Sequence, residues 1–310
     1  MSLWQNIIGD IILFDNFRLL KDNSAKKIML VLSIISIIIP FAVFFALLYK
    51  SRILLLSKPI TKILFSTSWL PSTGEFGLLA FIAGTFYVTL TAVIIAVPLS
   101  LFTSIYLSEY ANKRFQKFSS VVIDLLAGIP SVVYGIWGVL VIVPLIKKYI
   151  APFFGTVTSG YCILSGSIVL AIMIFPIIIQ ISYEILSSVP RELKDASLAL
   201  GATKWQTIKK VILRKSLTGI IAAIILGLSR ALGETMAVLM VVGNVSKIPK
   251  SICDPAYPLT ALIANNYGEM LSVPLYDSAI MLAAFILFLI VLIFNIAGRF
   301  VLSSIEGDLC

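Results

Sequence analysis

Six long apolar stretches dominate the pattern of hydrophobic and polar positions along the chain. A helix needs about 20 consecutive apolar residues to cross the hydrocarbon core of a bilayer, and each stretch meets that requirement. They lie at Ile28–Tyr49, Leu78–Leu107, Val121–Ile146, Ile163–Ser187, Thr218–Val242 and Ser278–Leu302. We therefore predict an all-α integral membrane protein with six transmembrane helices.

The segment before the first stretch has a different pattern. Asn6 and Asp10 lie opposite an apolar face with helical spacing, made of Leu3, Trp4, Ile7, Ile8, Ile11 and Ile12. This pattern predicts an N-terminal amphipathic helix in the cytoplasmic membrane interface. A helix packed on another subunit would show the same pattern. We divide the chain into this segment (1–27), a first transmembrane helix with an external loop (28–75) and a membrane core (76–310).

Composition supports a membrane protein. Of the 310 residues, 59% are hydrophobic and 13% are charged, whereas soluble proteins carry roughly a quarter charged residues. The mean hydropathy is +1.05. These values exclude a soluble enzyme, and they make loop residues a better explanation than nucleic-acid binding for the net charge of +9. The lack of histidine excludes a Ser-His or Cys-His catalytic pair and a His-ligated metal site in this chain.

Lys and Arg residues are distributed unevenly between the two sides of the predicted membrane. Fifteen fall on the side that holds both termini and the loop after the fourth stretch, and eight fall on the other side. Cytoplasmic loops carry the excess of positive charge. We therefore predict a multi-pass protein of the cell (inner or plasma) membrane with both termini in the cytoplasm.

The loop after the fourth stretch, residues 188–216, is too long for a simple connector. Residues that favour helix ends punctuate it: Ser188, Pro190 and Glu192 at a first start, Gly201 at a stop, and Thr203 with Gln206 in a capping box. These signals predict a helix, a sharp turn and a second helix. The first helix could dock on a partner, and a helical hairpin packed beneath its own bundle fits the pattern equally well.

This loop resembles the "EAA" loop of ABC-importer permeases. The similar residues are Asp195-Ala196-Ser197, Gly201, Val211 and Leu213. Asp195 replaces the Glu of that family's pattern, Ser197 its second Ala and Arg214 its Pro. In that family the loop is the coupling helix, which docks into a groove on the ATPase subunit. The resemblance therefore implies coupling to an ATPase through Lys194, Asp195, Ala196, Ser197 and Gly201.

Two charged residues, Arg230 and Glu234, lie within the fifth stretch. A charge near the membrane centre costs about 2.5–3.5 kcal/mol on the translocon scale, so such residues usually face a bundle interior or a watery path. At i, i+4 spacing the two could pair with each other on one helical face. Alternatively, the Arg230 guanidinium could bind an oxyanion while Glu234 accepts a hydrogen bond from protonated phosphate, which sulfate cannot donate.

Helix-weakening residues gather in the third stretch: Gly128, Pro130, Ser131, Gly135 and Gly138. Small residues let helices approach closely, and irregular backbone in a membrane is tolerated only where protein or water covers it. The pattern predicts either close helix packing or a kinked, pore-lining segment. For the second reading the candidate residues are Gly128, Pro130, Ser131 and Tyr134.

Several motifs in chain order resemble the phosphate-importer permeases of the PstC family. They are Gly84-Thr85, the run from Asp124 to Gly135, the run from Arg230 to Val238, and the run from Thr260 to Asn265. The resemblance spans about residue 76 to the C-terminus. It implies a type I ABC importer (MetI-like) permease fold for 76–310, a coupling loop at 188–216, and a substrate path with Arg230, Glu234 and Thr235.

The same resemblance implies a transport subunit that is not itself an enzyme. The expected partners are a PstA-like second permease, two PstB-like ATPase subunits, a PstS-like phosphate-binding protein and membrane lipid. The chain lacks the Gly-x4-Gly-Lys-Ser/Thr pattern of a P-loop, so we expect no cofactor here, with ATP and magnesium on the ATPase. Alternatives are a permease for another oxyanion (molybdate or sulfate), an ATP-independent secondary anion transporter, and an intramembrane enzyme, which the missing histidine weakens.

The predicted topology is tested at Cys310, the last residue of the chain. If both termini are cytoplasmic, a membrane-impermeant thiol reagent should leave Cys310 unlabelled in intact cells and label it after the membrane is permeabilised. The measurement is gel-shift labelling of a variant in which Cys162 and Cys253 are replaced by Ser. Ready labelling in intact cells would reverse the orientation.

Overall fold

The computed structural model describes residues 2–153, 155–268 and 273–307, with the side chains of 25–153, 155–268 and 273–303. It forms two units, residues 1–50 and 51–310. The first unit consists of most of helix α1 (Ser2–Ser57), which continues through residue 27 without a break. Its apolar side chains between residues 28 and 49 are largely exposed. The predicted amphipathic face at residues 3–12 lies outside the described side chains and stays a prediction.

The second unit is a helical bundle with a small two-stranded sheet, β1 (Trp69–Leu70) and β2 (Glu75–Phe76), paired antiparallel. Its long helices are α3 (Leu79–Glu109), α8 (Ile163–Ser187) and α15 (Pro274–Gly307). Shorter elements complete it: α2 (Ile60–Phe65), η1 (Pro71–Thr73), α4 (Lys113–Gly128), α5 (Ser131–Trp137), η2 (Gly138–Ile142), α6 (Val143–Leu145), η3 (Ile146–Ile150), α7 (Ala151–Phe153), α9 (Arg191–Ala199), α10 (Lys204–Thr207), η4 (Ile208–Ile212), α11 (Leu213–Lys215), α12 (Leu217–Gly233), α13 (Met236–Val241) and α14 (Leu259–Asn266).

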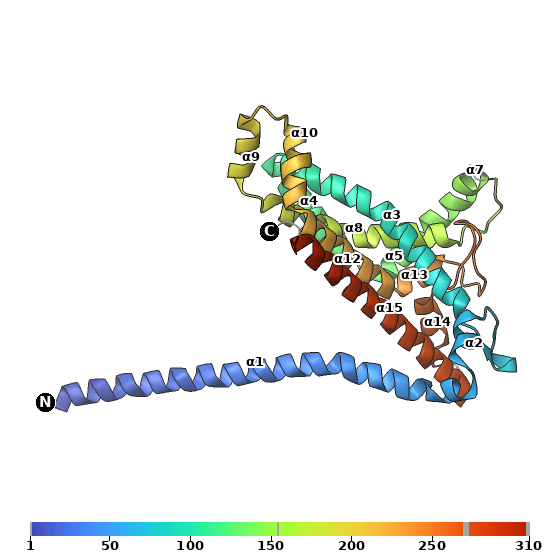
Figure 1. Ribbon diagram of the computed structural model, residues 1–310, viewed down its shortest axis with the longest axis horizontal. Coiled ribbons are helices and arrows are strands. Elements are labelled where there is room, and N and C mark those ends of the chain that lie inside the picture. Colours follow the sequence, from blue (N-terminus) through green and yellow to red (C-terminus); the bar gives the residue numbers. More distant parts are fainter. Residues whose placement is uncertain (1, 154, 269–272, 308–310) are drawn as a thin grey trace. The chain divides into compact units, whose positions relative to one another are not determined.

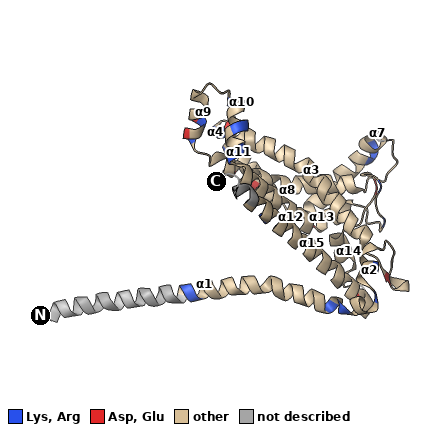
Figure 2. Ribbon diagram, viewed as in Figure 1, with Lys and Arg blue, Asp and Glu red and all other residues tan. Residues whose placement is uncertain are grey.

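Within the second unit, the loop elements α9 and α10 lie at one end, and α2, α7 and α14 lie at the other (Figure 1). Figure 2 shows Lys and Arg gathered on α9, α10 and α11 at the first end, and on α2 and on η3 next to α7 at the second. The ribbon between the two ends carries few charges. This is the charge distribution expected of a helical bundle that spans an apolar layer.

Among the described residues, five helices are long and apolar enough to cross a membrane: Ala25–Ser57, Leu79–Glu109, Ser131–Phe153, Ile163–Ser187 and Pro274–Ser303. A sixth span comes from a bent pair, 204–215 with 217–233, whose axes differ by 69°. The prediction of six spans is met if the bent pair is counted as one. The chain is therefore mostly helical with membrane-spanning helices, as the sequence predicted.

The predicted boundaries of the third and fifth spans were wrong. The sequence predicted one helix over Val121–Ile146. In the structure α4 ends at Gly128, and Ile129 is extended with a ψ of 128°. The next helix starts at Ser131. Pro130 causes this break, because proline has no backbone N–H and disfavours a helical residue before it. The helix expected over Thr218–Val242 breaks likewise, at Glu234.

Two segments that are distant in sequence meet at the α14 end of the bundle. The backbone N–H of Leu259 donates to the Thr85 hydroxyl over 2.9 Å, which ties the start of α14 to α3. A β-carbon on Gly84 would lie only 3.1 Å from the carbonyl oxygen of Tyr257. Gly84 thus allows the backbone before α14 to approach α3, and Thr85 holds it there. The segment 84–85 and the segment 260–265 therefore belong to one contact.

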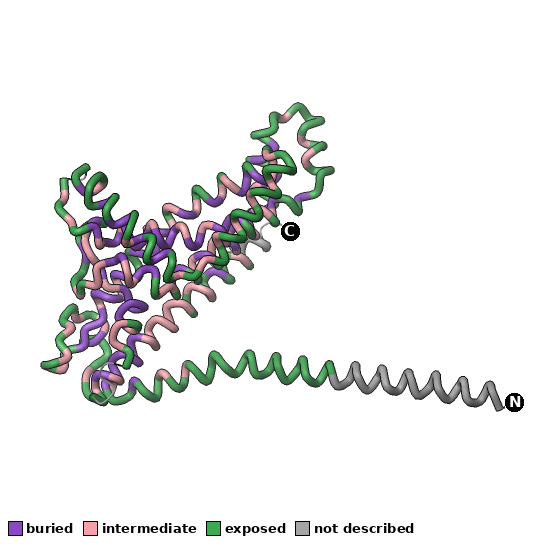
Figure 3. The backbone as a smooth tube through the Cα atoms, turned by 180° about the vertical axis from the view of Figure 1, so that it is seen from behind, coloured by how far each residue is buried: buried purple, intermediate pink, exposed green. Residues whose placement is uncertain are grey.

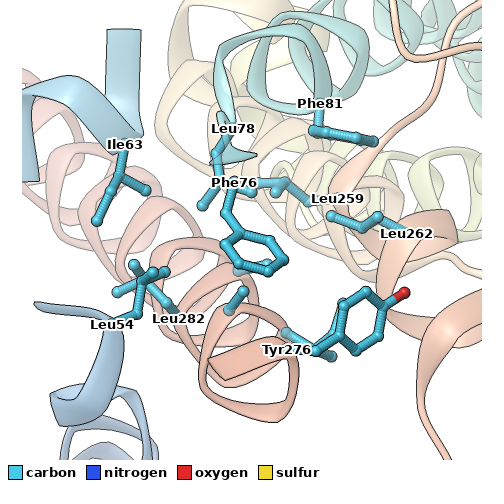
Figure 4. Close-up of a cluster of buried hydrophobic side chains, with 12 residues drawn as sticks. Leu54, Ile63, Phe76, Leu78, Phe81, Leu259, Leu262, Tyr276 and Leu282 are labelled. Carbon is cyan, nitrogen blue, oxygen red and sulfur yellow. The ribbon is translucent and has the colours of Figure 1, made fainter. Parts of the chain in front are cut away.

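An aromatic and aliphatic core closes the same end (Figure 4). Trp69 packs edge-on against Phe76 and Phe81, with ring centroids 5.3 and 5.2 Å apart. The backbone N–H of Leu54 donates to the Ser278 hydroxyl over 3.0 Å. This core fixes the β-hairpin, α2 and the start of α15 to one another. Cys162 and Cys253, whose pairing the sequence left open, are both buried and free.

Glycine allows close helix packing at Gly138. A β-carbon there would lie 2.7 Å from Val169 Cγ2 and 2.9 Å from Val241 Cγ1, whereas a β-carbon on Gly128 would meet nothing within 4 Å. We expect Gly138→Ala to lower the free energy of unfolding by about 1–3 kcal/mol through overpacking, with Gly128→Ala as the matched control near zero. Thermal unfolding of the purified protein measures both. An equal loss in the two variants would contradict the packing argument.

Candidate translocation and coupling sites

The first part of the candidate site is the break between α12 and α13. Glu234 ends α12 with a ψ of 130°, and its carboxylate Oε1 accepts hydrogen bonds from the backbone N–H groups of Thr235 and Ala237 over 3.1 and 3.4 Å. These bonds satisfy the amide groups that the break leaves without helical partners. Thr235 donates its hydroxyl to the Gly233 carbonyl over 3.3 Å. Glu234 therefore stabilises the break.

Arg230 lies in the last turn of α12 with an exposed side chain. Glu234 directly follows the end of α12 at Gly233, and its carboxylate is bound by the start of α13. The structure records no ion pair between the two within its described residues. The helix dipole favours a cation in this last turn. Arg230 thus presents an accessible guanidinium beside a break in a membrane-spanning segment.

The second part is the break between α4 and α5. The hydroxyl of Tyr134 donates to the carbonyl oxygen of Leu126 over 2.8 Å and so bridges the break. Pro130 is the residue before α5, and Ser131 is its first residue. Tyr134 is buried. Gly128, Pro130 and Ser131 form and flank the break.

The two broken segments pack directly on each other. A β-carbon on Gly135 of α5 would lie 2.6 Å from Met240 Sδ and 3.3 Å from Ala237 Cα, both on α13. Only glycine allows this approach without displacing α13. The two breaks therefore occur in helices that touch, and Arg230, Glu234 and Tyr134 belong to one region of the bundle.

Asn295 is a polar residue of this region that the sequence reasoning missed. The hydroxyl of Ser229, next to Arg230, contacts Asn295 Oδ1 on α15 at 3.0 Å, and Asn295 Nδ2 donates to the Val291 carbonyl over 2.8 Å. A polar contact between two apolar helices fixes how each is rotated. This contact sets the direction in which Arg230 leaves α12. An asparagine inside the last apolar stretch was the signal that could have found it.

The second candidate site is the loop at 188–216. Helix α9 ends in a Schellman motif, in which Gly201 has a φ of +83°. The N–H of Gly201 donates to Leu198 over 2.9 Å and that of Ala202 to Ser197 over 3.3 Å. The capping box of Thr203 and Gln206 is confirmed. The expected cap by Ser188 was wrong: its hydroxyl bonds to the Ile185 carbonyl, and Pro190 precedes the helix.

Helix α9 is almost entirely exposed (Figure 3). Asp195 and Ala196 face solvent, and so do several large apolar side chains of the loop: Leu193, Leu198, Leu200 and Trp205. Leu200 is 89% exposed. An apolar patch on a charged loop marks a protein contact surface. The part of α9 that carries Asp195, Ala196 and the exposed leucines is therefore not packed against the bundle.

Two of the predicted coupling residues make contacts within this chain, one with the bundle and one within the loop. Lys194 Nζ donates to Glu109 Oε1, at the end of α3, over 2.7 Å. The hydroxyls of Ser197 and Thr207 lie 3.0 Å apart. Lys194 and Glu109 line a cavity of about 690 Å³ between α9 and the ends of α3 and α8. Glu109 had no signal in the sequence, because only folding brings it to α9.

Groups of three or more Cys, Asp or Glu that could hold a metal ion do not occur among the residues that the structure describes. The geometry instead offers an accessible cation between two broken helices and an exposed helix at one end of the bundle.

Comparisons with known proteins show which proteins this chain is similar to. The chain is 38% identical over 261 residues to the phosphate transport system permease protein PstC of Xylella fastidiosa (strain 9a5c), covering 79% of this chain and 80% of that protein. It is 37% identical over 244 residues to the probable phosphate transport system permease protein PstC of Methanocaldococcus jannaschii, covering 75% and 77%.

Among solved structures, the chain resembles the inward-facing MetNI methionine ABC transporter with a TM-score of 0.54 and 21% sequence identity, over 74% of this chain and 94% of that one. This likeness confirms the predicted MetI-like fold. Residues 96–306 match the model of the binding-protein-dependent transport system inner membrane component. The chain therefore belongs to the family of inner membrane components of binding-protein-dependent transport systems.

Proposed function

We propose that this chain is the PstC-like permease subunit of an ATP-driven phosphate importer and forms the translocation path with a PstA-like permease. The observation that carries the proposal is the exposed Arg230 guanidinium beside the α12–α13 break, in a segment whose α13 packs against α5. Relatives that are 37–38% identical and are named phosphate permeases support the substrate. A charged side chain in a membrane-spanning segment usually lies on a substrate or ion path.

The chemistry of the region suits phosphate. The guanidinium of Arg230 can bind two oxygens of an oxyanion at once. Glu234 uses Oε1 to hold α13, and a carboxylate has lone pairs left to accept a hydrogen bond. Protonated phosphate can donate that bond, whereas sulfate cannot and would be repelled. Glu234 would thus have two roles, holding the break and discriminating between anions.

The rest of the machine would be supplied by partners. Two PstB-like ATPase subunits would bind α9 and carry ATP and magnesium, and a PstS-like protein would deliver phosphate at the opposite end. The end of the bundle with α9 would then be cytoplasmic, together with both termini, in the inner or plasma membrane. The exposed Leu193, Leu198 and Leu200 support α9 as the contact. Hydrolysis would move α9 and switch the path between inward-open and outward-open states.

Another oxyanion, molybdate or sulfate, and ATP-independent secondary transport remain the competing functions. Purifying the complex from its native membrane and identifying the co-purifying chains separates the classes. A nucleotide-binding subunit and a second permease are expected. Uptake by this chain alone in proteoliposomes, driven by an ion gradient without ATP, would contradict the proposal.

The substrate path is tested at Arg230 and Glu234. We expect Arg230→Gln to abolish phosphate uptake while assembly stays largely intact, and Arg230→Lys to be impaired because an ammonium lacks the two-pronged guanidinium. Glu234→Gln should retain uptake, since its amide oxygen can still cap α13. Its amide group can also donate, so rejection of sulfate should weaken. Uptake of labelled phosphate, with sulfate as competitor, measures each effect.

The Arg230→Gln, Glu234→Gln double variant provides the decisive comparison. If the two residues serve only to neutralise each other, each single change leaves an unpaired charge and the double change restores complex yield and uptake together. Recovery of transport in the double variant would therefore contradict the substrate-path role of Arg230.

The docking role of α9 is tested at Gly201. A φ of +83° disfavours residues with a β-carbon by about 1–2 kcal/mol. We expect Gly201→Val to leave the protein in the membrane and to reduce the ATPase that co-purifies with it. Gly201→Asn is the matched control, because asparagine tolerates the left-handed conformation. Undiminished ATPase binding by the Val variant would remove α9 as the docking element.

A further inference from the structure

The end of α3 is held by side chains from both arms of the loop at 188–216. From α9, Lys194 forms the 2.7 Å ion pair with Glu109. From α10, Lys204 Nζ lies 4.4 Å from the centroid of the Tyr110 ring, the residue after Glu109. We call these contacts, Lys194–Glu109 and Lys204–Tyr110, the α3 clasp. Two lysines on separate helices thus hold consecutive residues of one helix end.

The clasp joins an otherwise detached helix to the bundle. Helix α9 buries none of its residues, and the other side-chain contact that the described residues show for it, Ser197 with Thr207, stays within the loop. The side chain of Glu109 is 9% exposed and that of Lys194 is 20% exposed. Shielding from water strengthens such a pair relative to an ion pair on an open surface, and removing one partner leaves the other charge poorly solvated.

The helix that the clasp holds extends through the whole bundle. α3 runs from Leu79 to Glu109 and packs along α8, where the Ser167 hydroxyl donates to the Val88 carbonyl over 3.0 Å. Near its other end, Thr85 holds α14. A displacement of α9 can therefore reach the far end of the bundle through a rigid element. The covalent route from α10 to α12 passes instead through a bend of 69°.

Side chains from α4 stabilise the held end. Gln116 Nε2 donates to the carbonyl oxygens of Leu107 and Ala111 over 2.8 and 3.2 Å. These bonds satisfy carbonyls at the end of α3 and fix the position of Glu109 relative to α4, the helix that leads to the break at Pro130. The end of α3 is thus the point at which α9, α10 and α4 converge.

We infer that the Lys194–Glu109 pair transmits movement of α9 to α3, and that it is a positioning pair required to couple ATP hydrolysis to transport. The inference rests on the proposed function, in which α9 receives its movement from an ATPase. Lys194 acts here within its own chain, through Glu109. Binding and hydrolysis of ATP by the ATPase, and binding of phosphate in the substrate path, would each shift the position of α9 relative to α3.

The test compares Lys194→Met, Glu109→Gln and the exchanged double variant Lys194→Glu, Glu109→Lys in the purified complex in proteoliposomes. Both single variants should keep the ATPase bound and hydrolysing ATP, while phosphate transported per ATP falls about fivefold or more, as for a loss of ordinary coupling between sites. The exchanged pair should recover most of the ratio, because it restores opposite charges. Lys209→Met removes an exposed charge on the same loop and should change nothing.

Three outcomes would overturn the inference. The first is an unchanged ratio of phosphate to ATP in both single variants. The second is an exchanged pair no better than the single variants. The third is loss of ATPase binding in Lys194→Met with normal binding in Glu109→Gln, which would make Lys194 a direct docking contact. Absence of any ATPase from the wild-type complex would instead contradict the proposed function.

Discussion

A membrane-spanning helix that is interrupted must find protein partners for the backbone groups it releases, because lipid offers no hydrogen bonds. Two segments of this chain meet that constraint in opposite ways. At the α4–α5 break, the Tyr134 hydroxyl satisfies the Leu126 carbonyl. At the α12–α13 break, the Glu234 carboxylate satisfies the amides of Thr235 and Ala237. A hydroxyl donor thus satisfies a carbonyl at the end of one helix, and a carboxylate acceptor satisfies amides at the start of another, in keeping with the direction of the helix dipole.

These local solutions explain why the polar residues of the two segments are close together. Each break shortens a helix, and the absence of a side chain on Gly135 lets α5 touch α13. The Glu234 carboxylate accepts bonds from the start of α13, and no ion pair joins it to Arg230 among the described residues. The structure thus shows a capping carboxylate and an exposed cation, whereas a mutually neutralised pair was one of the two alternatives left open by the sequence. The anion-binding proposal depends on that separation.

The bundle connects this region to the exposed loop through a few specific contacts. Ser229 and Asn295 fix α12 against α15 beside Arg230. Gly84 and Thr85 hold α14 against α3 at one end, and Lys194 and Lys204 hold α3 at the other. Each contact joins residues far apart in the chain. The helices between them carry the apolar surface that the membrane requires and few polar groups of their own.

The sequence by itself determined the class of protein, the number of apolar spans and the local turns. These features depend only on residues that are close together in the chain. They are the length of each apolar stretch, the i, i+4 spacing, the capping box of Thr203 and Gln206, and the helix stop at Gly201. The breaks were only half predictable: Pro130 pointed to one, while the position of the other depended on the Glu234 carboxylate folding back on α13. Tertiary structure alone decided that Lys194 turns toward Glu109, that Ser229 meets Asn295, and that α5 packs against α13 at Gly135. Each of these contacts joins residues at least 66 positions apart, so no local periodicity can encode them, and helix packing sets them.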